Sequence, residues 1–200
     1  MSYRLELTAQ TEESLDVLKP ATYKGDLGYD LVIYKDIQFK PNETVKIDLN
    51  VKAKVFKKPD ILYFYMFPVI FSFMQNYFGL IAIILFAYRI FVKQRVGFFV
   101  FPRSSIYKTP LRLSNNVAVI DTYYDGNLCL LVDNIKNEPY TLKKGTSIAQ
   151  IVAGNMPITD MTFYDKDSQV ITIRSPNLDR NDRGFGSSDD FTTYDDLKID

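Results

Sequence analysis

A strict alternation of apolar and polar residues from Thr44 to Val55 constrains the fold of this chain more than any other feature. A period of two over this length predicts one full strand with a buried face and a solvated face. Its apolar positions are Val45, Ile47, Leu49, Val51, Ala53 and Val55, and between them stand Lys46, Asp48, Asn50, Lys52 and Lys54. Similar short runs occur at residues 127–132, 147–152 and 169–173, separated by turn signals such as Asp125-Gly126 and Lys143-Lys144-Gly145. Many short strands without clear amphipathic helices predict an all-β fold, which is a sandwich, a barrel or a jelly roll.

The composition limits the partners and the chemistry. The 200 residues suit one domain with a sizeable core. The 24 basic and 24 acidic side chains balance, so no overall field draws the chain to nucleic acid, and we expect no such partner. The single cysteine, Cys129, favours a reducing compartment, and the polar, acidic start is unlike a signal peptide. We therefore expect a cytoplasmic or nuclear protein. Because histidine is absent, any general base is a carboxylate or another non-imidazole group.

The segment from Ile61 to Tyr88 breaks the strand pattern, because it contains no charged residue. Its length of about 28 residues exceeds the roughly 20 that cross a bilayer as a helix. However, if the strands on either side belong to one domain, both ends of the insertion must lie on the same side of any membrane. The favoured interpretation is a hydrophobic hairpin packed on the domain or on a neighbouring subunit. Membrane contact through residues 61–88 is less favoured, and unspliced or mistranslated sequence is the third alternative.

Two motifs carry functional chemistry. Phe101-Pro102-Arg103-Ser104-Ser105 offers a guanidinium group and two hydroxyl groups, which suit phosphate oxygens. The second motif, residues 119–126, places Asp121 at the end of an apolar run, with Tyr124 three residues later at a Gly turn. Together they indicate a site that grips a phosphorylated ligand and aims a base at it.

Three further segments complete the pattern: Gly28-Tyr29-Asp30-Leu31, residues 145–150 (GTSIAQ) and residues 180–188 (RNDRGFGSS). The five segments in this order resemble the trimeric deoxyuridine triphosphatases (dUTPases), over roughly residues 20 to 190 apart from the insertion. The resemblance implies a jelly-roll or β-clip fold with a hydrophobic hairpin insertion. It divides the chain into a β domain at residues 1–174, with the insertion at about 58–95, and a flexible C-terminal arm at 175–200.

The resemblance also implies an activity, which is the hydrolysis of dUTP to dUMP and pyrophosphate. In the family, the aspartate at the position of Asp121 activates the water that attacks the α-phosphorus. Tyr124 matches the ring that packs on the deoxyribose, and Asn115 matches the residue whose amide binds uracil. Asp30 matches the acidic residue that holds waters of a triphosphate-bound Mg²⁺. The remaining residues that the resemblance assigns to substrate binding are Arg103, Ser104, Ser105, Gln150, Arg180, Phe185, Gly186 and Ser187.

The family forms homotrimers in which several subunits build each site and a C-terminal arm caps it. This chain departs from the pattern at Asn181 and Arg183, which replace two glycines of the arm. Asp125 stands where the family usually has Arg or Gln, which puts a local salt bridge in doubt. A related dCTP deaminase is disfavoured because Leu131 occupies the position of its required glutamate. A binding or regulatory protein that keeps the fold without activity remains the alternative from another class.

Overall fold

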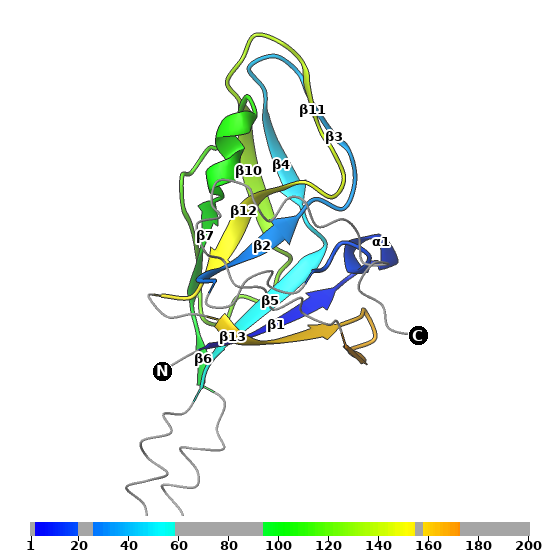
Figure 1. Cartoon of the computed structure of the whole chain (residues 1–200), viewed down its shortest axis with the longest axis vertical. Helices are drawn as coiled ribbons and strands as arrows, with labels where there is room; N and C mark the ends of the chain where they lie inside the picture. The colour runs from blue at the N-terminus through cyan, green and yellow to red at the C-terminus, as the bar shows by residue number, and fades with distance from the viewer. Residues whose placement is uncertain (1–2, 20–25, 59–93, 155–157, 173–200) are drawn as a thin grey trace, which may run out of the picture.

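Short strands form most of the chain in this computed structural model, which describes residues 3–19, 26–58, 94–154 and 158–172 (Figure 1). The helical elements of these residues are α1 (Glu12–Leu15) and the 3₁₀ helix η1 (Ser104–Lys108). The strands are β1 (Tyr3–Ala9), β2 (Gly28–Val32), β3 (Ile37–Phe39), β4 (Thr44–Asp48), β5 (Val51–Lys57), β6 (Gln94–Val96), β7 (Phe98–Pro102), β8 (Leu111–Leu113), β9 (Ala118–Ile120), β10 (Cys129–Asn134), β11 (Tyr140–Leu142), β12 (Ser147–Val152), β13 (Ile158–Tyr164) and β14 (Val170–Ile171). The predicted all-β class is confirmed.

The strands form four small sheets. Their orders are β14-β13-β1-β5-β6, β2-β12-β7-β9, β4-β10-β8 and β11-β3. Strands β1 and β13 run parallel, and the other described pairs are antiparallel. The jelly-roll expectation is therefore met by several short sheets rather than by one long sheet. Within each sheet, strands that are distant in the sequence pair with one another.

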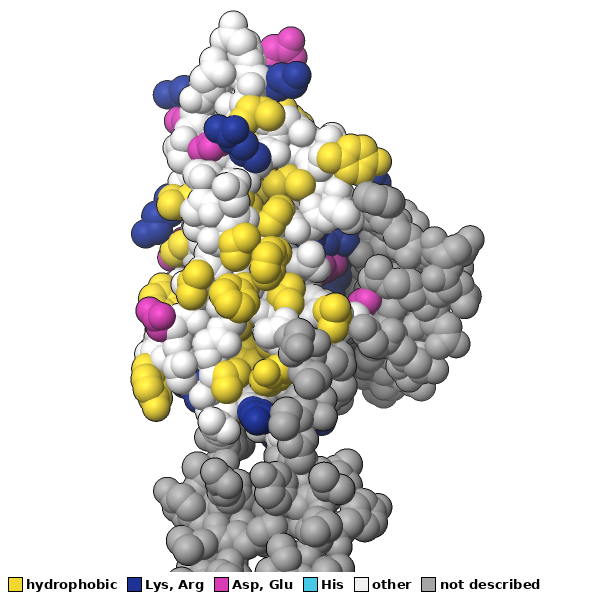
Figure 2. Space-filling view, turned by 90° about the vertical axis from the view of Figure 1, so that its left-hand side faces the viewer, with side chains coloured by type: hydrophobic (Ala, Val, Ile, Leu, Met, Phe, Trp, Pro, Cys, Tyr) yellow, Lys and Arg dark blue, Asp and Glu magenta, His cyan; other side chains and the backbone are white. Residues whose placement is uncertain are grey.

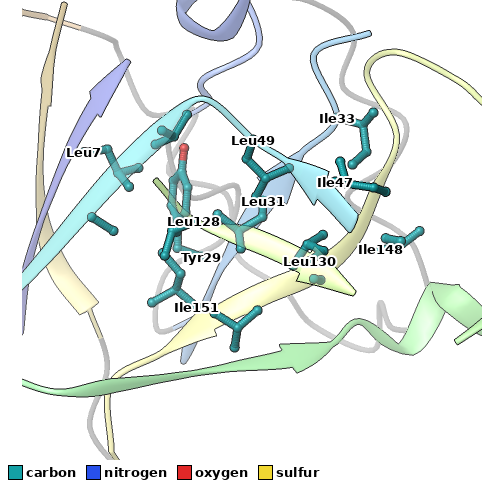
Figure 3. Close-up of a cluster of buried hydrophobic side chains, with 14 of the residues drawn as sticks. Leu7, Tyr29, Leu31, Ile33, Ile47, Leu49, Leu128, Leu130, Ile148 and Ile151 are labelled. Atoms are coloured by element: carbon teal, nitrogen blue, oxygen red, sulfur yellow. The ribbon is translucent and has the colours of Figure 1, made fainter. Parts of the chain in front are cut away.

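One hydrophobic core joins all four sheets. Figure 3 shows side chains from β1, β2, β4, β10 and β12 pointing toward one another, among them Leu7, Leu31, Ile47, Leu130 and Ile151. Each of these side chains is at most 3% exposed, and full burial of a residue of this size contributes about 1.5–3 kcal/mol. The shared core fixes the relative positions of the sheets.

The prediction of one full strand from Thr44 to Val55 is wrong in its continuity. The run is divided into β4 and β5, which belong to different sheets. The break falls at Asn50, whose φ of 51° lies in the left-handed region that asparagine tolerates. Its N–H donates to Asp48 Oδ1 at 2.8 Å, which closes a local turn. The burial alternation persists across the break, since Leu49 and Val51 are both buried.

Strand β5 precedes the insertion in the sequence, and strand β6 follows it. Lys57 lies opposite Gln94 in their antiparallel register, so the two ends of the insertion are neighbours. The predicted hairpin and its membrane contact at 61–88 lie outside the described residues, as does the predicted arm at 175–200. Among the helices that the structure describes, none combines the length and the apolar character needed to cross a membrane.

Candidate active site

A row of three side chains crosses the outer face of the four-stranded sheet. Gln150 on the central strand β12 lies opposite Asp30 on β2 and opposite Phe101 on β7. The neighbouring residues Tyr29 and Ile151 are buried in the core, so alternation directs the row outward. The row therefore brings together two residues predicted for the triphosphate, Asp30 and Gln150.

Arg103 completes this group from the end of β7. Its Nε lies 2.8 Å from Asp30 Oδ1, and its Nη1 donates to the Ser147 carbonyl at 3.0 Å. The side chain of Arg103 is 8% exposed and that of Asp30 is 34% exposed. A charge-assisted hydrogen bond of this length holds the guanidinium group in a defined orientation. We call Asp30, Arg103 and Gln150 the phosphate-side group.

The two serines after Arg103 have different surroundings. Ser104 is exposed at the start of η1, where its hydroxyl can meet a ligand. Ser105 is buried, and its hydroxyl donates to the Ser147 carbonyl at 3.5 Å. Ser147 also donates its own hydroxyl to the Leu31 carbonyl at 2.6 Å. Ser147 is thus a structural support of the phosphate-side group, although only its place in the segment 145–150 marks it in the sequence.

Gly28 sets the position of the Gln150 side chain. The Gln150 amide donates from Nε2 to the Pro102 carbonyl at 3.3 Å. A Cβ atom at Gly28 would lie 2.2 Å from Gln150 Oε1 and 2.9 Å from Cδ, so glycine leaves room for the amide in this orientation, and a larger residue would displace it. An isolated glycine in a strand is a sign of such close approach, and Gly28 is a candidate site residue whose role the sequence pattern alone does not indicate.

Asp121 and Tyr124 lie in a short loop that follows β9. The Tyr124 N–H donates to the Asp121 carbonyl at 3.1 Å, and the Tyr124 hydroxyl donates to the Asn127 carbonyl at 2.8 Å. Both side chains are exposed. A Cβ atom at Gly126 would lie 2.5 Å from the Tyr124 hydroxyl oxygen, so Gly126 makes room for this ring. We call residues 121–126 the aspartate loop.

Asp125 of the aspartate loop forms ion pairs with two basic side chains on the neighbouring strands β5 and β6. Its Oδ1 lies 3.0 Å from Arg95 Nη1 on β6 and 3.5 Å from Lys54 Nζ on β5. The hydrogen bond from Arg95 is the main cause that lowers the pKa of Asp125. A salt bridge is therefore present at this position, with the acid on the loop and the bases on the strands, which is the reverse of what an arginine at position 125 would give.

Asn115 lies in the exposed turn between β8 and β9. The preceding Ser114 donates its hydroxyl to Asp133 on β10. Asp133 also accepts hydrogen bonds from Thr44 at 2.7 Å and from Arg112 at 3.1 Å. These donors, with Ser114 foremost, lower the pKa of Asp133. The turn is thus tied to the three-stranded sheet.

The aspartate loop and the phosphate-side group lie at opposite ends of β7. Ile120 lies opposite Phe98 at the start of this strand, whereas Arg103 follows its last residue. At about 3.3 Å per residue, the strand separates Asp121 from Arg103 by roughly 20 Å. One chain therefore does not bring the predicted base to the predicted phosphate ligands.

Four predicted residues, Arg180, Phe185, Gly186 and Ser187, lie outside the described residues. Within the described ranges, no group of three or more acidic or cysteine side chains could hold a metal ion directly. A single carboxylate that is one third exposed, such as Asp30, fits an Mg²⁺ ion that keeps several waters and takes its other oxygens from phosphate.

Comparison with known proteins identifies relatives over part of the chain. A family model described as dUTPase matches residues 81–189, which is more than half of the 200 residues. A deoxyuridine 5'-triphosphate nucleotidohydrolase of Desulfitobacterium hafniense strain DSM 10664 / DCB-2 is 39% identical over 92 residues, covering 46% of this chain and 54% of the relative. The enzyme of the same name from Wolbachia pipientis wMel is 32% identical over 88 residues, covering 44% of this chain and 54% of the relative. The chain thus spans about half the length of the curated relatives it matches.

The solved structures that are similar to the chain include two dUTPases. The dUTPase of Staphylococcus bacteriophage 80alpha has a TM-score of 0.47 and 17% identity, covering 92% of this chain and 96% of that one. The EIAV dUTPase has a TM-score of 0.44 and 19% identity, covering 74% of this chain and 85% of that one.

Proposed function

The chain belongs to the dUTPase family, and on that premise we propose that it hydrolyses dUTP to dUMP and pyrophosphate. The observation that carries the proposal is the family match over residues 81–189. This range includes every predicted site residue except Asp30. The two curated relatives described above are deoxyuridine 5'-triphosphate nucleotidohydrolases.

The phosphate-side group binds the triphosphate in this proposal. A triphosphate carries nearly four negative charges, and phosphoryl transfer depends largely on positioning and on charge neutralisation. The buried guanidinium group of Arg103 supplies a fixed positive charge, and the exposed Ser104 and the Gln150 amide supply donors beside it. Arg180, Gly186 and Ser187 of the predicted arm add to this grip by family resemblance.

Asp121 acts as the base. Its carboxylate accepts a proton from a water molecule, whose oxygen forms a bond to the α-phosphorus while the bond from that phosphorus to the bridging oxygen of the β-phosphate breaks. Pyrophosphate leaves with the bond electrons, and dUMP remains. A carboxylate is a weak base near neutral pH, so its contribution depends on accurate placement. The turn that joins Tyr124 N–H to the Asp121 carbonyl supports such placement.

Three residues select the nucleoside. Tyr124 packs on the deoxyribose and leaves no room for a 2′-hydroxyl group, and its ring is held by the bond from its hydroxyl to Asn127. Asn115 binds the uracil edge from a turn that is tied to Asp133 through Ser114. Phe185 stacks on the base by family resemblance.

Asp30 would hold water ligands of an Mg²⁺ ion on the triphosphate. When bound, this ion neutralises charge on the phosphate oxygens. Asp30 also pairs with Arg103 at 2.8 Å, so the same carboxylate connects the proposed metal position with the guanidinium group that binds phosphate. Asp30→Asn should therefore weaken both the Mg²⁺ dependence and the triphosphate affinity.

A homotrimer with sites shared between subunits follows from the same proposal. The separation of Asp121 from Arg103 along β7 supports a site in which they come from different subunits. An apolar row runs beside the row of Asp30, Gln150 and Phe101. In it, Phe99 on β7 lies opposite Val119 on β9, and their side chains are 37% and 69% exposed. Figure 2, which views the molecule from the side of β7, shows hydrophobic side chains gathered along this face. In this proposal a second copy docks on this face and supplies its aspartate loop to the site that contains Arg103.

Pyrophosphate release from dUTP tests the activity. The full chain should turn over dUTP, and Asp121→Asn should lose nearly all turnover while its nucleotide affinity stays within a few-fold, because the amide keeps the shape and removes the base. Near-normal kcat in this variant would overturn the assignment of Asp121. Binding of dUTP by the unaltered chain without pyrophosphate release would support the inactive binding protein instead.

Mixing two inactive variants tests the shared site. Neither Asp121→Asn nor Arg103→Met should be active alone. After refolding together in equal amounts, subunits combine at random, and roughly a quarter of the sites receive Asp121 and Arg103 from subunits that retain them. Recovery of activity near this fraction supports sites between subunits. No recovery from well-folded mixed oligomers would show that one chain supplies both residues.

A further inference from the structure

Arg95 on β6 contacts the aspartate loop from outside the recognised motifs. One guanidinium nitrogen, Nη1, donates to Asp125 Oδ1 at 3.0 Å, and the other, Nη2, donates to the Tyr124 carbonyl. Lys54 approaches the same carboxylate oxygen at 3.5 Å from β5. The side chain of Arg95 is 14% exposed, whereas that of Asp125 is 63% exposed, so the arginine is packed against the domain while its ion pair with Asp125 faces solvent.

The aspartate loop depends on such polar contacts, because its side chains bury little surface. Asp121, Tyr123 and Tyr124 are all exposed, and Tyr123 is 83% exposed. At the start of the loop, Gly97 packs closely against the Ile120 carbonyl, where an added Cβ atom would lie at 2.9 Å. At its other end, the Arg95 guanidinium binds the Tyr124 carbonyl and the Asp125 carboxylate. The backbone between these two points includes Asp121.

We infer that Arg95 is a positioning residue for the reaction, which fixes the aspartate loop so that the Asp121 carboxylate and the Tyr124 ring keep their orientation. This inference rests on the proposed function. In this role Arg95 acts through its contacts with the loop. Asp125 orients the guanidinium group, whose second nitrogen then holds the Tyr124 carbonyl. Asp125, which stands where the family usually has Arg or Gln, thus pairs with the basic residue Arg95 on β6.

The test compares Arg95→Met with Arg95→Lys in the full chain, with dUTP and UTP as substrates. Arg95→Met keeps the aliphatic stem and removes both donors, so kcat for dUTP should fall by about 10-fold or more, since small displacements of a catalytic group are costly. The preference for dUTP over UTP should fall with it, because the Tyr124 ring loses its support. Arg95→Lys should recover part of both, because an ammonium group can donate to either acceptor.

Lys143→Met is the matched control. It breaks an exposed ion pair with Asp36, at 2.8 Å, that lies outside the aspartate loop. It should leave kcat and the dUTP preference unchanged. Wild-type kcat and preference in Arg95→Met would overturn the inference. An equal loss in Arg95→Met and Arg95→Lys would also overturn it, since a side chain that retains a donor would then give no rescue.

Hydrogen exchange separates this inference from the proposed function. The amide of Tyr124 is bonded within the loop, and its exchange in Arg95→Met should accelerate relative to the unaltered chain and to Lys143→Met. Faster exchange together with absent dUTP hydrolysis by the unaltered chain would refute the function and leave the positioning role intact. Unchanged exchange in the loop would refute the positioning role whatever the activity.

Discussion

Replacing Gly28 by alanine should disturb Gln150 without disturbing the backbone. Gly28 lies on β2, diagonally across from Gln150 on β12. The new Cβ atom would lie 2.2 Å from Gln150 Oε1, so the terminal amide must turn away. Its 3.3 Å hydrogen bond to the Pro102 carbonyl is then lost. The amide also leaves the position from which we propose that it binds phosphate.

Two opposed effects determine the stability of Gly28→Ala. Alanine in a strand is favoured over glycine by about 0.5–1 kcal/mol, because it loses less conformational entropy on folding. The lost Gln150 hydrogen bond costs about 0.5–1.5 kcal/mol. The free energy of unfolding should therefore change by less than about 1 kcal/mol, which corresponds to a Tm shift of a few degrees. The KM for dUTP should rise by about tenfold, because a hydrogen bond to a charged group contributes about 1.5 kcal/mol or more.

A double-mutant cycle in urea unfolding isolates this contact. In a Gln150→Ala background the crowding is absent, so Gly28→Ala should stabilise the chain by about 0.5–1 kcal/mol. The two substitutions should likewise fail to add in KM, since each removes the same amide from the site. If the effects of the two substitutions add in both stability and KM, Gly28 does not act through Gln150, and the reasoning is refuted.

Three further predictions concern other parts of the molecule. Tyr124→Ala should reduce the preference for dUTP over UTP, which we expect to be at least on the order of 10³ in kcat/KM, and an unchanged ratio would remove Tyr124 from sugar selection. Because the pKa of Asp133 is lowered in the folded chain, its stabilising effect should be complete above the unfolded value of about 3.9 and vanish as pH falls through the folded value. The Tm difference between the unaltered chain and Asp133→Asn should therefore be constant at neutral pH and shrink below about pH 4, and a difference independent of pH would contradict this. Replacing residues 59–93 by a short Gly/Asn turn should give a soluble, active protein because Lys57 and Gln94 already pair, whereas extending the replacement to 58–95 should reproduce the loss of Arg95.

The sequence predicted the parts of the molecule that depend on local pattern. Alternation correctly indicated the burial of Leu49 and Val51, and the run predicted at 147–152 is β12, which carries Gln150. It did not predict the division at Asn50, because an asparagine on the polar side of a strand looks the same whether its φ is negative or positive. Arg95 was missed because its partner Asp125 stands 30 residues away and pairs through tertiary contact alone.

The parallel pairing of β1 with β13 has a consequence for synthesis of the chain. Tyr3 lies opposite Ile158, so one edge of β1 finds its partner only after nearly the whole domain has been made. The other edge pairs much earlier, with β5. At about 5–20 residues per second, the open edge waits on the order of ten seconds on the ribosome. Its unpaired N–H and C=O groups can meanwhile add a strand from another nascent chain. Losses to aggregation should therefore arise during translation, and slowing association between nascent chains should improve yield more than stabilising the finished fold.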